Sequence, residues 1–195
     1  MQTTSVILIA ILAAAAVVAI LVWLGMRRHR TEALRERFGD EYDRTLEEQG
    51  KRAKAEAALQ ERKERVARLD VRPLDPRERE AAITEWREVK AVFVDSPVEA
   101  VHHADRLLAA IMKARGYPMA DFDRRYEDLT VDHGEVARHY REGHQITERH
   151  RMGEASTEDL RQAMIHFEAL FDDLVNEVAP DDEARPVRAR ARTAH

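Results

Sequence analysis

An uncharged apolar run near the start of the chain constrains the fold more than any other feature. Residues 6–26 contain no Asp, Glu, Lys or Arg and consist of Val, Ile, Leu and Ala with one Trp, one Gly and one Met. At about 1.5 Å per residue, a helix of about 20 residues crosses the roughly 30 Å hydrocarbon core of a bilayer. A helix also satisfies its own backbone polar groups in lipid. The run therefore predicts a transmembrane helix over residues 6–26, after a short segment at 1–5.

The residues that flank this run predict its orientation. Arg27, Arg28 and Arg30 follow it directly, whereas residues 1–5 contain no basic side chain. Positively charged flanks tend to stay in the cytoplasm, and an amphipathic ring such as that of Trp23 prefers the level of the lipid headgroups. We therefore expect a single-pass protein of the cell membrane, with its N-terminus outside and the rest of the chain in the cytoplasm.

A cleaved secretory signal is the alternative interpretation of the same run. Such a signal has a positively charged start, a shorter apolar core and a cleavage site of small residues after that core. Here the start is uncharged, and the small residues 13–16 lie inside the apolar run. These departures favour a permanent anchor, and export of the remaining chain behind a signal sequence stays open as the alternative.

The composition of the chain predicts an all-α protein. Of its 195 residues, 35% are charged and 6% aromatic, and there are only seven Gly and six Pro, which suits helices better than hairpins. The net charge of −5 argues against non-specific nucleic-acid binding. The absence of Cys excludes disulfides, thiolate nucleophiles and Cys-ligated zinc.

Residues 27–70 predict a charged juxtamembrane helix or stalk. An apolar stripe recurs there at every fourth residue, formed by Leu34, Phe38, Tyr42 and Leu46. Gly39 followed by Asp40 is a candidate break in this helix. Acid-first pairs four residues apart, such as Glu48 with Arg52 and Glu61 with Arg65, are expected to support it. A weak coiled-coil seam, and with it a homodimer, stays open, although one heptad register places Arg52 in the core.

Residues 76–178 predict a compact antiparallel bundle of about five helices. Helix starts are marked at Asp75-Pro76-Glu78, at Ser96-Pro97-Glu99 and at Ser156 or Thr157. Gly116 and Gly153 are the predicted helix stops. The expected core residues share helical spacing: Ala82, Trp86, Val89, Phe93, Val101, Ala104, Leu108, Ile111, Met112, Phe122, Tyr126, Leu129, Leu160, Ala163, Met164, Phe167, Leu170, Phe171, Leu174 and Val178. We expect residues 179–195 to be a disordered basic tail.

Several segments resemble an uncharacterised bacterial family of short membrane-anchored helical proteins. These segments are Arg37 to Arg44 (RFGDEYDR), Gly116 to Pro118 (GYP), Val131 to His133 (VDH) and Gly153 to Ala163 (GEASTEDLRQA). The resemblance covers most of the chain after the apolar run. It implies an architecture that recurs as a unit in secreted or membrane proteins, and it implies no activity.

Histidine is the residue type with most potential chemistry in the predicted bundle. Positions eleven apart lie at nearly the same angle on a helix, so His133 is expected to align with His144, and His139 with His150, on two different faces. Ligands for one metal more often lie three or four residues apart. Glu99 and His102 have the Glu-x-x-His spacing, but no second such pair follows. We therefore predict no metal ligand and no cofactor.

No stretch carries a catalytic or nucleotide-binding signature, so we predict that the chain is not an enzyme and has no small-molecule substrate. The expected function is that of a membrane-anchored helical interaction or scaffold module. It would bind the lipid bilayer and either an unknown protein or a second copy. Tyr117 and Met119 are candidate partner contacts, although a ring in such a loop often packs onto its own bundle. The alternative is a metal- or pH-responsive sensor, or a metal-dependent enzyme, built on the bundle histidines.

Overall fold

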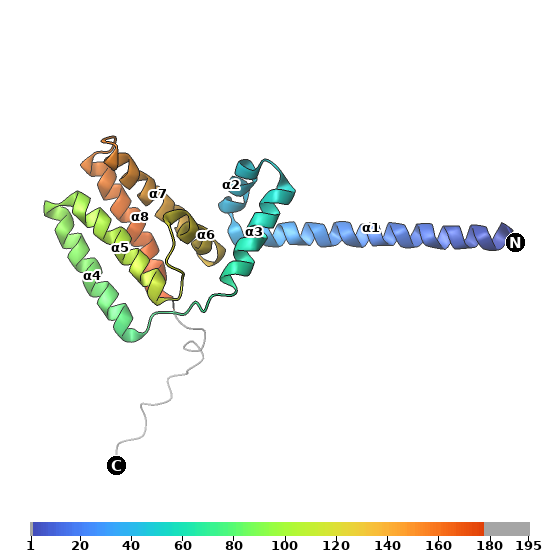
Figure 1. Ribbon diagram of the computed structural model, residues 1–195, viewed down its shortest axis with the longest axis horizontal. Helices are drawn as coiled ribbons and strands as arrows, with labels where there is room; N and C mark the ends of the chain where they lie inside the picture. The colour runs from blue at the N-terminus through green and yellow to red at the C-terminus, as the bar shows by residue number, and fades with distance from the viewer. Residues whose placement is uncertain (1, 178–195) are drawn as a thin grey trace, which may run out of the picture. The chain divides into compact units, whose positions relative to one another are not determined.

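The computed structural model describes the backbone of residues 2–177 and the side chains of residues 17–177. Over these residues the chain forms helices and no strands, which confirms the prediction of an all-α protein. The eight helices are α1 (Gln2–Phe38), α2 (Asp40–Gln49), α3 (Arg52–Val66), α4 (Pro76–Asp95), α5 (Pro97–Ala114), α6 (Phe122–Asp132), α7 (Gly134–Arg151) and α8 (Thr157–Asn176) (Figure 1).

The chain divides into two compact units. The N-terminal unit comprises residues 1–61 and the bundle unit comprises residues 62–195, so that the division falls within α3. The predicted basic tail at 179–195 and the predicted core residue Val178 lie outside the described residues.

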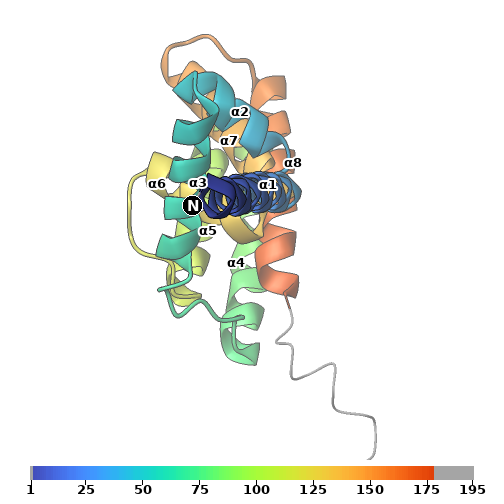
Figure 2. The same cartoon turned by 90° about the vertical axis from the view of Figure 1, so that its right-hand side faces the viewer.

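Helix α1 is a single uninterrupted helix of 37 residues, seen end-on in Figure 2. The apolar residues from Val17 to Met26 are exposed, and Gly25 among them is partly buried. Among the residues whose side chains are described, none of the helices combines the length and the apolar character needed to cross a membrane. The predicted span at 6–26 lies partly outside that search, because the side chains of residues 2–16 are not described.

The rest of the N-terminal unit is folded around one carboxylate. Glu56 of α3 accepts hydrogen bonds from Thr31 of α1 at 2.7 Å, from Tyr42 of α2 at 3.0 Å and from Arg52 at 2.8 Å. Arg52 also donates to the Thr31 hydroxyl at 2.6 Å. Burial alone would raise the pKa of Glu56, but these three donors outweigh it and hold that pKa below its ordinary value. Three helices are therefore tied together by one ionised side chain.

The prediction of one helix with a single break was therefore incomplete. The expected break at Gly39 is present, and a second break at Gly50 separates α2 from α3. Arg52 bonds Glu56 rather than Glu48, and Arg65 bonds residues of α6 rather than Glu61. Arg52 therefore pairs with a residue four positions later in α3, whereas Arg65 pairs with residues of another helix.

Within the bundle unit, the ends of the helices follow the local signals in the sequence. Asp75 caps α4 in a complete capping box with Glu78, and Ser156 caps α8 in another with Asp159. Helix α5 begins at Pro97 as expected, although Ser96 makes no side-chain capping bond. Asp132 ends α6, and α7 begins two residues later at Gly134. Together α4 to α8 account for the five helices expected in this stretch (Figure 1).

The core of the bundle unit draws apolar side chains from all five of these helices. Every predicted core residue up to Leu174 is buried, except for Phe93 and Phe122, which pack partly buried against the cluster. The rings of Trp86 and Phe171 stack with centroids 4.6 Å apart, which joins α4 to α8. Additional buried residues include Leu107, Ala137, Tyr140, Ile146 and Val175.

A buried arginine, Arg115, lies at the C-terminal end of α5. The Arg115 side chain is fully buried and donates to the backbone oxygens of Arg72 and Leu174 and to the Glu177 carboxylate. Next to it, Gly116 has φ +101°, and a Cβ there would lie 2.3 Å from the Asp70 oxygen. Glycine is thus required both by the backbone angle and by the close approach of the preceding linker.

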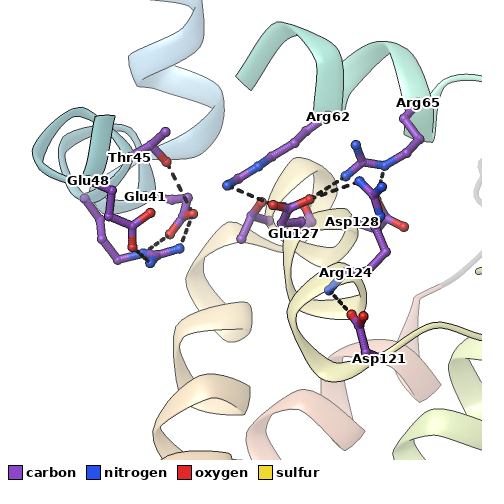
Figure 3. Close-up of polar contacts among 11 residues, drawn as sticks. Glu41, Thr45, Glu48, Arg62, Arg65, Asp121, Arg124, Glu127 and Asp128 are labelled. Atoms are coloured by element: carbon purple, nitrogen blue, oxygen red, sulfur yellow. Dashed lines mark hydrogen bonds and ion pairs between the residues drawn. The ribbon is translucent and has the colours of Figure 1, made fainter. Parts of the chain in front are cut away.

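The last turn of α3 is joined to α6 by ion pairs (Figure 3). Arg65 bonds Asp128 at 2.8 Å and Glu127 at 2.9 Å, and Arg62 bonds Glu127 at 3.3 Å. Asp128 is almost completely buried, so its pairing with Arg65 compensates for the loss of water around its charge. These contacts place the end of α3 against the bundle unit to which it belongs.

Candidate functional site

Two histidines and one glutamate converge where α7 packs against α8. The Nδ1 atoms of His139 and His166 lie 3.0 Å apart. Oε2 of Glu142 lies 3.3 Å from Nδ1 of His166 and 3.8 Å from Nδ1 of His139. Within the described part of the chain, this is the group of histidine and acidic side chains close enough to hold one metal ion. The three side chains are called the His139–Glu142–His166 cluster below.

Local helix geometry and one glycine position these three side chains. His139 and Glu142 are three residues apart on α7, so both lie on the same face of that helix. Gly143 follows directly, and a Cβ at this position would lie 2.6 Å from the Phe167 ring of α8. The missing side chain lets α7 approach α8 closely, which brings His166 opposite His139 and Glu142.

The cluster is partly buried and reachable from solvent. The side chains of His139, Glu142 and His166 are 32%, 39% and 22% exposed. A shallow surface depression runs past Glu142 and His166, with Glu148 and Arg149 also on its wall. Burial lowers the pKa of His166, the neighbouring His139 and Arg138 lower it further, and Glu142 opposes them. The neutral form of this ring is thereby favoured at neutral pH.

Of the two pairs of histidines eleven residues apart, only His139 and His150 lie on one helix, α7. His133 precedes α7 as its N-cap residue, so it does not share a helix face with His144. It pairs instead with Asp173, while His144 stacks on the Phe122 ring with centroids 3.6 Å apart. His150 bonds the backbone oxygen of Ala155 at 3.1 Å and is not a neighbour of His139 in the cluster.

Glu99 and His102, which have the Glu-x-x-His spacing of some metal sites, line a surface depression near the start of α5. No third histidine or acidic ligand joins it in the described part of the chain. The sequence signal that does belong to the cluster is the His139-x-x-Glu142 spacing on α7. Its partner His166 comes from another helix, so only the packing of α7 on α8 identifies it.

The residues predicted to mark the membrane boundary lie within the C-terminal end of the exposed apolar part of α1 and directly after it. Trp23 is 58% exposed, and the Arg27 guanidinium lies over its ring at 5.5 Å from the centroid. Arg28 and Arg30 are also exposed on the next turn. The arrangement combines an amphipathic ring with a dense group of positive charges.

The two candidate partner contacts differ in exposure. Tyr117 is 3% exposed and belongs to the core of the bundle unit, and burial raises the pKa of its hydroxyl. The Tyr117 ring therefore packs onto its own bundle, which was the other possibility given for it in the sequence analysis. Met119 is 64% exposed and remains available for contact in the loop between α5 and α6.

Comparisons with protein-family models, with curated proteins and with solved structures found no match for this chain. The resemblance noted from the sequence therefore stays a prediction, and the functional argument rests on the residues of this chain.

Proposed function

We propose that this chain is a single-pass membrane protein whose residues 6–26 form the anchor. The remaining helices form a non-catalytic interaction module at the cytoplasmic face. The observation that carries the proposal is the uncharged apolar run in the sequence of α1. Residues 6–26 contain no charge, and the backbone is helical through all of them. The length of this run matches the thickness of the hydrocarbon core.

The exposure of the described half of this run supports the proposal. Val17, Val18, Ile20, Leu21, Val22 and Trp23 are each between 56% and 62% exposed. Apolar side chains exposed around a helix are unfavourable in water, at about 25 cal/mol per Å² of apolar surface. A bilayer removes that cost, which makes lipid the surroundings that best suit this segment.

The charges after the anchor support the orientation. Arg27, Arg28 and Arg30 lie beyond the apolar run, and the Trp23 ring under Arg27 suits the headgroup region. Each basic residue near an anionic membrane surface contributes about 1 kcal/mol of attraction. The N-terminus then lies outside the cell and the bundle unit inside.

The interaction role is supported by the bundle unit. Its surface carries many charged side chains, and the exposed Met119 offers a flexible apolar contact for a protein partner or a second copy. Sedimentation of the full chain in detergent tests this role. We expect either a dimer or a complex with a stoichiometric partner, whereas a lone monomer that recovers no partner contradicts it.

The absence of native cysteine allows a direct test of the topology. We would introduce single cysteines by Thr3→Cys and Glu154→Cys and treat intact cells with a membrane-impermeant maleimide. Thr3→Cys should react in intact cells, and Glu154→Cys only after lysis. The cysteine-free parent chain is the matched control. Labelling of Glu154→Cys in intact cells contradicts the proposed orientation.

A further inference from the structure

We propose that His139, Glu142 and His166 bind one divalent transition-metal ion of the zinc type. The ion would cross-link α7 to α8. This inference is independent of the membrane anchor, because all three ligands lie within the bundle unit. It assigns a metal site where the sequence alone predicted none.

The separations between the three ligand atoms carry the inference. A point equidistant from atoms that are 3.0, 3.3 and 3.8 Å apart lies about 2.0 Å from each of them, which agrees with zinc–nitrogen and zinc–oxygen distances of about 2.0–2.2 Å. One ion could therefore contact all three atoms with little movement of either helix.

The ligand types fit the same group of ions. Imidazole nitrogen suits zinc, copper, nickel and iron, and two histidines with one carboxylate form a known zinc ligand set. Three protein ligands leave a fourth position open. The depression that runs past Glu142 and His166 provides a path for the ion from solvent.

A hydrogen bond between the rings explains only part of this geometry. If His139 donates its Nδ1 proton to Nδ1 of His166, that nitrogen also faces the Glu142 oxygen at 3.3 Å, as one acceptor facing another. If His166 donates instead, its single proton is shared between two acceptors. A cation between the three atoms accepts one lone pair from each of them.

His133 also has two acidic neighbours, but their arrangement around its ring is different. His133 contacts Asp173 through Nδ1 and Glu177 through Nε2, which lie on different sides of the ring. One ion cannot contact both nitrogens of one ring. Glu177 is also bonded to the buried Arg115. In the part of the chain that the structure describes, the converging geometry is found in the His139–Glu142–His166 cluster.

Zinc titration of the full chain tests the proposal. The protein is purified in detergent without a histidine tag, stripped with a chelator and titrated with Zn²⁺ in a calorimeter. We expect one ion per chain and a rise in the unfolding temperature on binding. His139→Gln and His166→Gln should each weaken binding at least tenfold, since even outer-shell changes at metal sites cost about 10- to 100-fold.

The matched control is His103→Gln in α5. His103 also faces a carboxylate, Glu85 at 3.0 Å, but in the described part of the chain it does not belong to a group of three potential ligands. Zinc affinity should be unchanged in this variant. Glu142→Gln provides a further variant with the shape of the cluster retained, for use if a histidine variant loses helix content. An absence of zinc binding by the parent chain, or binding that survives in His166→Gln and Glu142→Gln, overturns the proposal.

Discussion

The N-terminal unit and the bundle unit are each stabilised internally by a different kind of interaction. In the N-terminal unit, the Glu56 carboxylate accepts hydrogen bonds from three helices. Among the side chains described in this unit, few apolar residues are buried: Leu34, Phe38, Tyr42, Ala55 and Leu59. In the bundle unit, five helices contribute to one large apolar core. Hydrophobic burial stabilises a fold in proportion to area, whereas a polar network depends on a few atoms and on pH. The units should therefore respond differently to mutation and to acid.

The largest effect is expected from loss of core volume in the bundle unit. Phe167 is fully buried between α7 and α8, and Phe167→Ala should lower the free energy of unfolding by about 3–5 kcal/mol. Peptide-resolved hydrogen exchange should show faster exchange in α5, α7 and α8, with little change in α2. Ile165→Ala, at a position 46% exposed on the same helix, is the control and should cost less than about 1 kcal/mol. Equal effects of the two variants would refute the role of the core.

A smaller effect is expected at the buried arginine. Arg115→Met removes bonds to two backbone oxygens and to Glu177, and should destabilise the bundle unit by about 2 kcal/mol, because only part of this network is shielded from water. Urea unfolding measures this loss. Arg161→Met breaks an exposed pair with Glu158 and should change the urea midpoint much less than Arg115→Met does. An Arg115 variant as stable as the parent chain would show that the network contributes nothing.

In the N-terminal unit, one polar substitution should loosen three helices. Glu56→Gln keeps the shape of the side chain but removes the charge that accepts from Thr31, Tyr42 and Arg52, at a cost of about 1–2 kcal/mol. Hydrogen exchange should increase in α2 and α3 and stay unchanged in α8. Glu36→Gln, on the exposed surface of α1, is the matched control. A change confined to α8 would contradict the division into units.

The smallest expected effect is a difference in the pH at which each unit begins to lose stability. Burial lowers the pKa of His144 and of His166, so the unfolded chain binds protons more readily, and stability of the bundle unit should decline as pH falls below about 6.5. Glu56 has a lowered pKa, so its contribution is complete above the ordinary glutamate value of about 4.3 and is lost below it. Hydrogen exchange between pH 7.5 and 5 should therefore change in α7 before it changes in α2. The reverse order would contradict these assignments.

The sequence was most informative where structure depends on neighbouring residues. The capping boxes at Asp75 and Ser156 predict the start of α4 and α8, because both partners lie within one turn. Periodicity identified most of the core for the same reason. The break at Gly50 was missed, although its left-handed backbone is one that glycine adopts readily.

The candidate metal site was beyond sequence reasoning because it depends on how two helices pack. His139 and Glu142 are adjacent on α7, but His166 lies on α8 and meets them only because Gly143 permits a close approach. In the same way, Arg65 of α3 pairs with Asp128 of α6, and no local rule selects that partner. The missed features are those that join separate segments of the chain.

The most direct measurement of the central claim is alkaline carbonate extraction of membranes from cells that produce the full chain. Our account predicts that the chain stays in the membrane pellet. Val17→Arg combined with Leu21→Arg should move it toward the supernatant, because each arginine adds about 2.5–3.5 kcal/mol to the cost of insertion near the middle of a span. Recovery of the parent chain in the supernatant would contradict the proposed anchor.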